Sequence, residues 1–68
     1  MDIKLIGDRV KKLRTQNTSF SQEEFAKVVG LDRTYMSRVE SGKQNVTIET
    51  LIRICDGLGI SLKDFFDF

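Results

Sequence analysis

The chain lacks proline, histidine and tryptophan, and it has one cysteine among 68 residues. Without histidine there is neither an imidazole base for catalysis nor a Cys/His cluster for a structural zinc ion. A lone cysteine cannot form an internal disulfide, and no Gly-rich phosphate loop is present. We therefore expect no enzyme, no metal site and no cofactor.

Long apolar runs are also missing. No segment approaches the roughly 20 apolar residues of a membrane span, and the N-terminus alternates charged with apolar residues instead of forming a signal-peptide core. We therefore expect a cytosolic protein without a membrane partner. A chain this short forms one domain with a small core, so dimerisation is the remaining way to add stability.

Apolar residues recur at helical spacing along the whole chain. In the first helix, before the polar break at residues 17–19, the charged residues, Arg14 among them, are predicted to lie mostly on the solvent face. In the second helix Phe25, Val28 and Val29 are predicted to point inward. The predicted buried positions of the first, third and fourth helices are Ile3, Ile6, Val10 and Leu13, then Met36 and Val39, then Ile48, Leu51, Ile52, Cys55 and Leu58.

Polar and glycine residues mark where these helices begin and end. Ser21 and Glu24 form a capping box, and Asp32 caps the third helix. Thr47 caps the fourth helix, and Ser61 with Asp64 repeats the capping pattern before residues 62–68. Helix ends are predicted at Gly30, Gly42 and Gly59. The prediction is an all-α fold of five helices in a single domain, residues 1–68.

Residues 22–41 form two short helices separated by "GLD". A helix-turn-helix needs a small residue where the helices cross and a glycine at the turn, and Ala26 and Gly30 supply them. The apolar contacts that hold the second of these helices are predicted from Phe25, Val29, Leu31, Met36 and Val39.

The segment from Val10 to Phe66 resembles the helix-turn-helix domain of phage repressors, Cro proteins and xenobiotic-response-element regulators. "LDRTYMSRVESGKQNVTI" is most similar to the controller proteins of restriction-modification systems, small dimers that regulate their own gene and the endonuclease gene. The resemblance implies a compact lambda-repressor-like fold. It also implies a transcriptional regulator that binds palindromic half-sites of double-stranded operator DNA as a homodimer, with residues 33–41 in the major groove. A phage-type repressor and an antitoxin are the alternatives.

The resemblance places Gln22 at a phosphate, unless it only fills a capping position. Arg33 is the main candidate for reading a base, because a guanidinium can donate two hydrogen bonds to guanine; an ion pair with Asp32 or a phosphate contact is the alternative. Thr34 and Ser37 are predicted to contact bases or phosphates. Tyr35 is predicted to cover the core with its ring while its hydroxyl reaches the DNA backbone.

Arg38 stands where controller proteins usually have a glycine, so it either extends the DNA footprint or pairs with Glu24 or Glu40 in solvent. The loop that follows meets the phosphate backbone in the family. Its candidate donors are Ser41, Lys43, Gln44 and Asn45. Ordinary turn chemistry is the alternative for this loop, above all for Gln44 and Asn45. Gln44 replaces an arginine of the controller proteins, which should weaken phosphate attraction.

The C-terminus carries more aromatic surface than a short helix can bury. Its apolar residues are the predicted two-fold interface: Ile60, Leu62, Phe65, Phe66 and Phe68. Such a dimer would place two recognition helices about 34 Å apart on successive major grooves. An activator would also contact RNA polymerase.

The net charge of +1 is small for a protein that binds a polyanion. Residues 1–48, however, hold nine Lys/Arg against six Asp/Glu, whereas residues 49–68 hold two against four. Helix N-termini and neutral donors add phosphate contacts that formal charge does not register. We expect weak non-specific binding, with base contacts and dimerisation supplying a larger share of the affinity.

Overall fold

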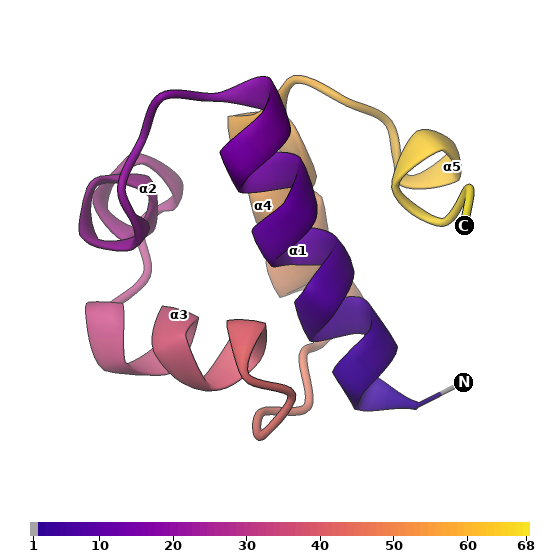
Figure 1. The fold of residues 1–68 in the computed structure, drawn as a ribbon, viewed down its shortest axis with the longest axis horizontal. Helices are drawn as coiled ribbons and strands as arrows, with labels where there is room; N and C mark the ends of the chain where they lie inside the picture. The colour runs from indigo at the N-terminus through magenta and orange to yellow at the C-terminus, as the bar shows by residue number, and fades with distance from the viewer. Residues whose placement is uncertain (1) are drawn as a thin grey trace.

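The computed structural model describes residues 2–68, and in this range the chain forms five helices and no strand. Two helices, α1 (Ile3–Asn17) and α4 (Ile48–Leu58), pack against each other in the centre (Figure 1). On one side lie α2 (Gln22–Val29) and α3 (Arg33–Glu40), and on the other lies α5 (Leu62–Phe65). The predicted all-α class with five helices is confirmed.

The helix boundaries follow the capping residues. In the capping box the Glu24 amide donates to the Ser21 hydroxyl at 3.1 Å, and the Ser21 amide donates to the Glu24 carboxylate at 2.9 Å. Gly30 and Gly59 take left-handed conformations with φ of 74° and 72°. The last helix ends at Phe65, earlier than predicted. Local side-chain chemistry therefore accounts for most of the helix ends.

The core is a single cluster to which all five helices contribute. Cys55 is buried in it, and this burial raises the pKa of the thiol, as expected for a packed side chain. The buried apolar residues are Val10, Leu13, Phe25, Ala26, Val29, Met36, Val39, Leu51, Ile54, Cys55, Leu58 and Phe65.

Three apolar residues predicted to point inward are exposed. On α4, Ile48 is 61% exposed and Ile52 is also exposed, whereas Ile54 is fully buried. On α2, Val28 is exposed beside the buried Val29. Each helix carries more apolar residues than one buried stripe can hold, so contacts with the neighbouring helices decide which of them face solvent.

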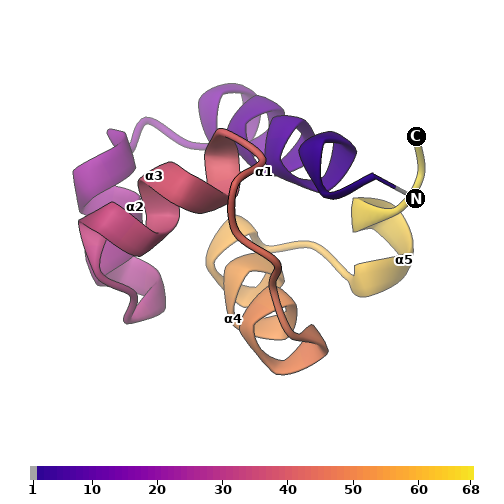
Figure 2. The ribbon, with the colours of Figure 1, turned by 90° about the horizontal axis from the view of Figure 1, so that it is seen from below.

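A close approach between α1 and α3 positions the second half of the helix-turn-helix (Figure 2). Gly7 of α1 is buried there, and a Cβ atom at this position would collide with the carbonyl oxygen of Val39. It would also lie 3.0 Å from the Gly42 nitrogen and 3.2 Å from the Glu40 carbonyl oxygen. Only glycine lets the two backbones come this close.

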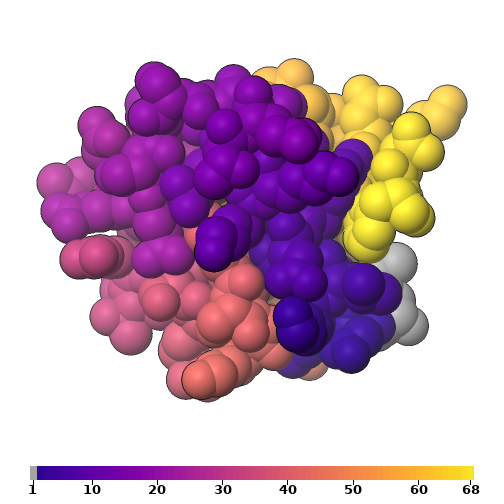
Figure 3. Space-filling model, in the orientation of Figure 1, coloured from indigo at the N-terminus to yellow at the C-terminus, as the bar shows by residue number. Residues whose placement is uncertain are grey.

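The space-filling view shows the side chains of α1 filling the region between α2 and α5 (Figure 3). Across residues 2–68, no helix combines the length and the apolar character needed to cross a membrane.

Candidate nucleic-acid interface

The turn between α2 and α3 is held by backbone and side-chain hydrogen bonds. The Leu31 amide donates to the Ala26 carbonyl at 2.8 Å, which closes α2 around the left-handed Gly30. Arg53 of α4 donates to the Gly30 carbonyl at 2.7 Å. The predicted turn is confirmed, but the contribution of Arg53 was not foreseen, because it comes from a distant part of the chain.

One side of α3 is buried and the other is open to solvent. The Asp32 carboxylate accepts the Thr34 amide at 2.7 Å and so starts the helix. Met36 and Val39 are buried, and Tyr35 is half-buried against the core, in agreement with the prediction for its ring. The exposed residues of α3 include Arg33, Thr34, Ser37 and Arg38.

These exposed residues share one hollow with the first residue of α2. The hollow is open, has a volume of about 370 Å³, and is lined by Gln22, Arg33, Thr34, Ser37 and Arg38. Its lining carries two guanidinium groups, two hydroxyls and one amide. These groups can donate to phosphate oxygens and to the edges of bases. The structure thus brings together five of the predicted DNA-contacting residues.

Arg33 pairs with Glu23 of α2, with 3.4 Å between the guanidinium and carboxylate atoms. The partner in the alternative sequence interpretation was Asp32, and that interpretation is wrong because the Asp32 carboxylate caps α3 instead. Both members of the pair are largely exposed. An exposed ion pair contributes at most about 1 kcal/mol, so Arg33 can leave Glu23 for a stronger partner.

Arg38 binds the loop that follows α3. Its guanidinium donates to the Gln44 side-chain oxygen at 3.3 Å and to the Lys43 carbonyl at 3.0 Å. The alternative partners named from the sequence, Glu24 and Glu40, are wrong: Glu24 completes its capping box and Glu40 is buried. Arg38 therefore lines the hollow and also ties the loop to α3.

The loop also forms local hydrogen bonds of its own. The Ser41 hydroxyl donates to the Arg38 carbonyl at 3.2 Å, and the Gln44 amide donates to the Asn45 carbonyl at 3.2 Å. Ser41, Lys43 and Asn45 are exposed. Both the local turn chemistry and the exposed donors expected from the sequence are thus present at this loop.

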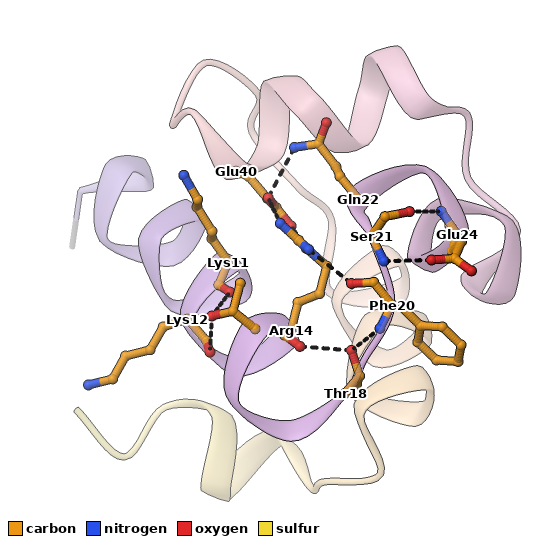
Figure 4. Close-up of polar contacts among 10 residues, drawn as sticks. Lys11, Lys12, Arg14, Thr18, Phe20, Ser21, Gln22, Glu24 and Glu40 are labelled. Atoms are coloured by element: carbon orange, nitrogen blue, oxygen red, sulfur yellow. Dashed lines mark hydrogen bonds and ion pairs between the residues drawn. The ribbon is translucent and has the colours of Figure 1, made fainter.

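A buried ion pair contacts Gln22, one of the residues that line the hollow (Figure 4). Arg14 of α1 and Glu40 of α3 approach at 2.8 Å and 3.1 Å, and their side chains are only 11% and 2% exposed. Arg14 also donates to the Phe20 carbonyl at 3.0 Å, and Gln22 donates to Glu40 at 3.0 Å. The hydrogen bonds with Glu40 raise the pKa of Arg14.

The predicted solvent-facing position of Arg14 is wrong, and the role of Glu40 was missed. Arg14 lies four residues after the buried Val10, and Glu40 lies four residues after the buried Met36. Two opposite charges at the borders of buried faces are the signal that would have indicated a buried pair.

The C-terminal residues predicted to form a dimer interface differ in exposure. Phe65 is 0% exposed, so its assignment to the interface is wrong: it belongs to the core of the single subunit. Phe68 is 56% exposed, and the remaining members, Ile60, Leu62 and Phe66, are partly buried. Arg9 holds this end of the chain, since it donates to the Phe65 carbonyl at 2.8 Å and its guanidinium lies 5.4 Å from the Phe68 ring centre.

The structure thus has a short helix, α3, which is anchored by buried residues on one side and exposes hydrogen-bond donors on the other, with the start of α2 beside it. This is the arrangement of helix-turn-helix domains. The family model described as helix-turn-helix matches residues 10–65, and the chain belongs to this family.

Within the family, the chain is similar to the controller proteins of restriction-modification systems. It is 50% identical over 66 residues to control protein C.MunI of Mycoplasma sp, which covers 96% of this chain and 89% of the relative. The restriction-modification controller protein C.AhdI of Aeromonas hydrophila superposes with a TM-score of 0.89 at 35% identity, covering 96% of this chain and 93% of that one.

The controller protein C.Esp1396I, solved as a tetramer with its natural 35 base-pair operator, superposes with a TM-score of 0.86 at 35% identity, covering 96% and 84% of the two chains. The resemblance to controller proteins drawn from the sequence is confirmed.

Proposed function

We propose that the protein is a transcriptional regulator of the controller type, which binds palindromic operator DNA as a homodimer with α3 in the major groove. The observation that carries this proposal is the open hollow over α3, where Gln22 meets the exposed donors of the recognition helix. The similarity to C.MunI and C.Esp1396I supports the controller assignment.

The residues that read the bases lie in the first half of α3. Arg33 stands on the first turn of this helix, and its only ion pair among residues 2–68 is the exposed one with Glu23. Release from Glu23 leaves the guanidinium free to donate two hydrogen bonds to O6 and N7 of a guanine. Thr34 and Ser37 offer hydroxyls to neighbouring bases or phosphates from the same face.

The groups that bind phosphate lie at the N-terminus of α2 and in the loop after α3. The N-terminus of α2 presents backbone amides and Gln22, and neutral groups of this kind bind phosphate without formal charge. The loop after α3 presents Lys43 and Asn45. Because Lys43 is the only cation of this loop, we expect a shallow dependence of affinity on salt.

Dimerisation uses the C-terminal apolar surface, formed by Ile60, Leu62, Phe66 and Phe68. A single subunit leaves Phe68 exposed, and burial of apolar rings is the main source of interface stability. The two-fold axis sets the α3 helices about 34 Å apart, one turn of the double helix. At a promoter where the dimer activates transcription, it would also contact RNA polymerase.

The test begins with selection of bound sites from random DNA, which should recover a palindrome. Arg33→Ala should then lose discrimination between the selected site and random DNA by about 1 to 3 kcal/mol, while weak non-specific binding persists. Lys63→Ala removes an exposed cation of α5, away from α3, and serves as the matched control. Equal weakening on both DNAs would make Arg33 a phosphate contact, and no retention of DNA by the wild type would reject the function.

A further inference from the structure

We propose that the buried Glu40 is a positioning residue, which orients the side-chain amide of Gln22 in the hollow toward a DNA phosphate. The inference rests on the proposed function, because it assigns to Glu40 a part in DNA binding that needs no contact with DNA. Its basis is the hydrogen bond of 3.0 Å between Gln22 and Glu40.

The chemistry of a carboxylate allows one orientation of the amide. Ionised Glu40 can only accept hydrogen bonds, so the NH₂ end of Gln22 must face it, and a flipped amide would set oxygen against oxygen. Figure 4 shows the Gln22 nitrogen toward Glu40 and the oxygen pointing away. One N–H of the amide is bound by Glu40. The second N–H is left for an acceptor in the hollow that Gln22 lines.

Glu40 can act as an anchor because it is itself held rigidly. Its two oxygens accept from Arg14 at 2.8 Å and 3.1 Å, and Arg14 is held in turn by the Phe20 carbonyl. Among residues 2–68 no buried side-chain nitrogen or oxygen is without a hydrogen-bond partner. The carboxylate therefore cannot turn away without breaking a buried pair.

This anchoring should raise the affinity for DNA without altering sequence preference. A glutamine that is already held in place loses little further side-chain freedom when a phosphate arrives. The phosphate carries no sequence information, so the effect is equal on operator and random DNA. Gln22 begins α2 and Glu40 ends α3, so the same contact also fixes the two outer ends of the helix-turn-helix relative to each other.

The test separates positioning from folding with the double variant Arg14→Met/Glu40→Met. Replacing both members of a buried pair by apolar residues of similar volume commonly preserves the fold, yet it removes the acceptor of Gln22. DNA affinity is measured for the wild type, Gln22→Ala, the double variant and the triple variant. We expect Gln22→Ala and the double variant each to bind about tenfold more weakly per half-site, and the triple variant to bind no more weakly than either.

Lys43→Ala is the matched control, because loss of this loop cation should weaken binding by the same factor in the wild type and in the double variant. Two results would overturn the inference. One is a double variant that binds DNA as tightly as the wild type, and the other is a triple variant that loses as much further affinity as Gln22→Ala alone loses. If the double variant does not fold, Arg14→Leu/Glu40→Leu replaces it in the same comparison, because it also removes the acceptor of Gln22 together with its buried partner. Losses that add to that of Gln22→Ala again overturn the inference. Failure of the wild type to bind DNA would instead reject the proposed function.

Discussion

The close packing of α1 on α3 can be tested with one methyl group, by the substitution Gly7→Ala. Gly7 lies inside α1, where alanine is ordinarily the better helix former by about 1 kcal/mol. In isolation the substitution should therefore stabilise the helix. In this fold the added Cβ atom would collide with the Val39 carbonyl oxygen and would meet two further backbone atoms at 3.0 Å and 3.2 Å.

The collision outweighs the helix propensity because the three atoms nearest to the added methyl group all belong to the backbone. A backbone cannot rotate away as a flexible side chain can, so α1 and α3 must separate. Overpacking of this kind costs about 1 to 3 kcal/mol, and we take the upper end, which leaves a net loss of about 2 kcal/mol. For a domain of this size, such a loss lowers the melting temperature by roughly 8 to 16 °C.

Thermal unfolding followed by circular dichroism measures this loss, at one protein concentration because dimerisation shifts the midpoint. Gly59→Ala is the control: its glycine has a positive φ but nothing within 4 Å of the added atom, so only the cost of the left-handed conformation remains. DNA affinity of Gly7→Ala should fall as well, because α3 is displaced. A melting temperature at or above that of the wild type would refute the close approach of α1 and α3.

Two further predictions concern acid stability and assembly. The hydrogen bond from the Ser21 amide lowers the pKa of Glu24 below its ordinary value. At a pH above the ordinary pKa the ionised carboxylate therefore stabilises the fold. This stabilisation is lost as the pH falls through the lowered pKa of the folded state. Glu24→Gln should therefore have a lower melting temperature than the wild type at neutral pH, but not in acid. A difference in melting temperature that stays the same across a pH series would contradict this prediction. Phe68→Glu should yield monomers in a sedimentation experiment. Val28→Glu changes a similarly exposed apolar residue on α2 and should leave the dimer intact. If only Ile52→Glu yields monomers, the interface lies on α4 instead.

Much of the candidate site was predictable because its residues are neighbours in the chain. Gly30 sets the turn and Asp32 starts α3, and both act through hydrogen bonds to backbone groups only a few residues away. The exposure of Arg33 and Ser37 follows from the period of the helix once Met36 and Val39 are buried. Their roles toward DNA remain predictions.

Other parts of the site depend on residues far apart in the chain. The Arg53 side chain that holds the turn at Gly30 is 23 residues away from it in the sequence. The ion-pair partners named as alternatives for Arg33 and Arg38 were wrong, because Arg33 pairs with Glu23 of the preceding helix and Arg38 binds the loop after α3. Phe65 was assigned to the interface, because an aromatic sequence does not reveal which ring enters the core. The tertiary structure places Phe65 inside and leaves Phe68 outside.

The sequence by itself determined the five helices, most of their ends, the helix-turn-helix and the face of α3 that points to solvent. These features arise from contacts over one or two helical turns, where spacing alone brings groups together. The tertiary structure alone decided that α4 buries Ile54 in place of Ile48 and Ile52, and why Gly7 is required. It also decided that Arg14 and Glu40, 26 residues apart, form the buried pair that holds Gln22, because such a pair exists only once α1, α2 and α3 have packed and excluded water.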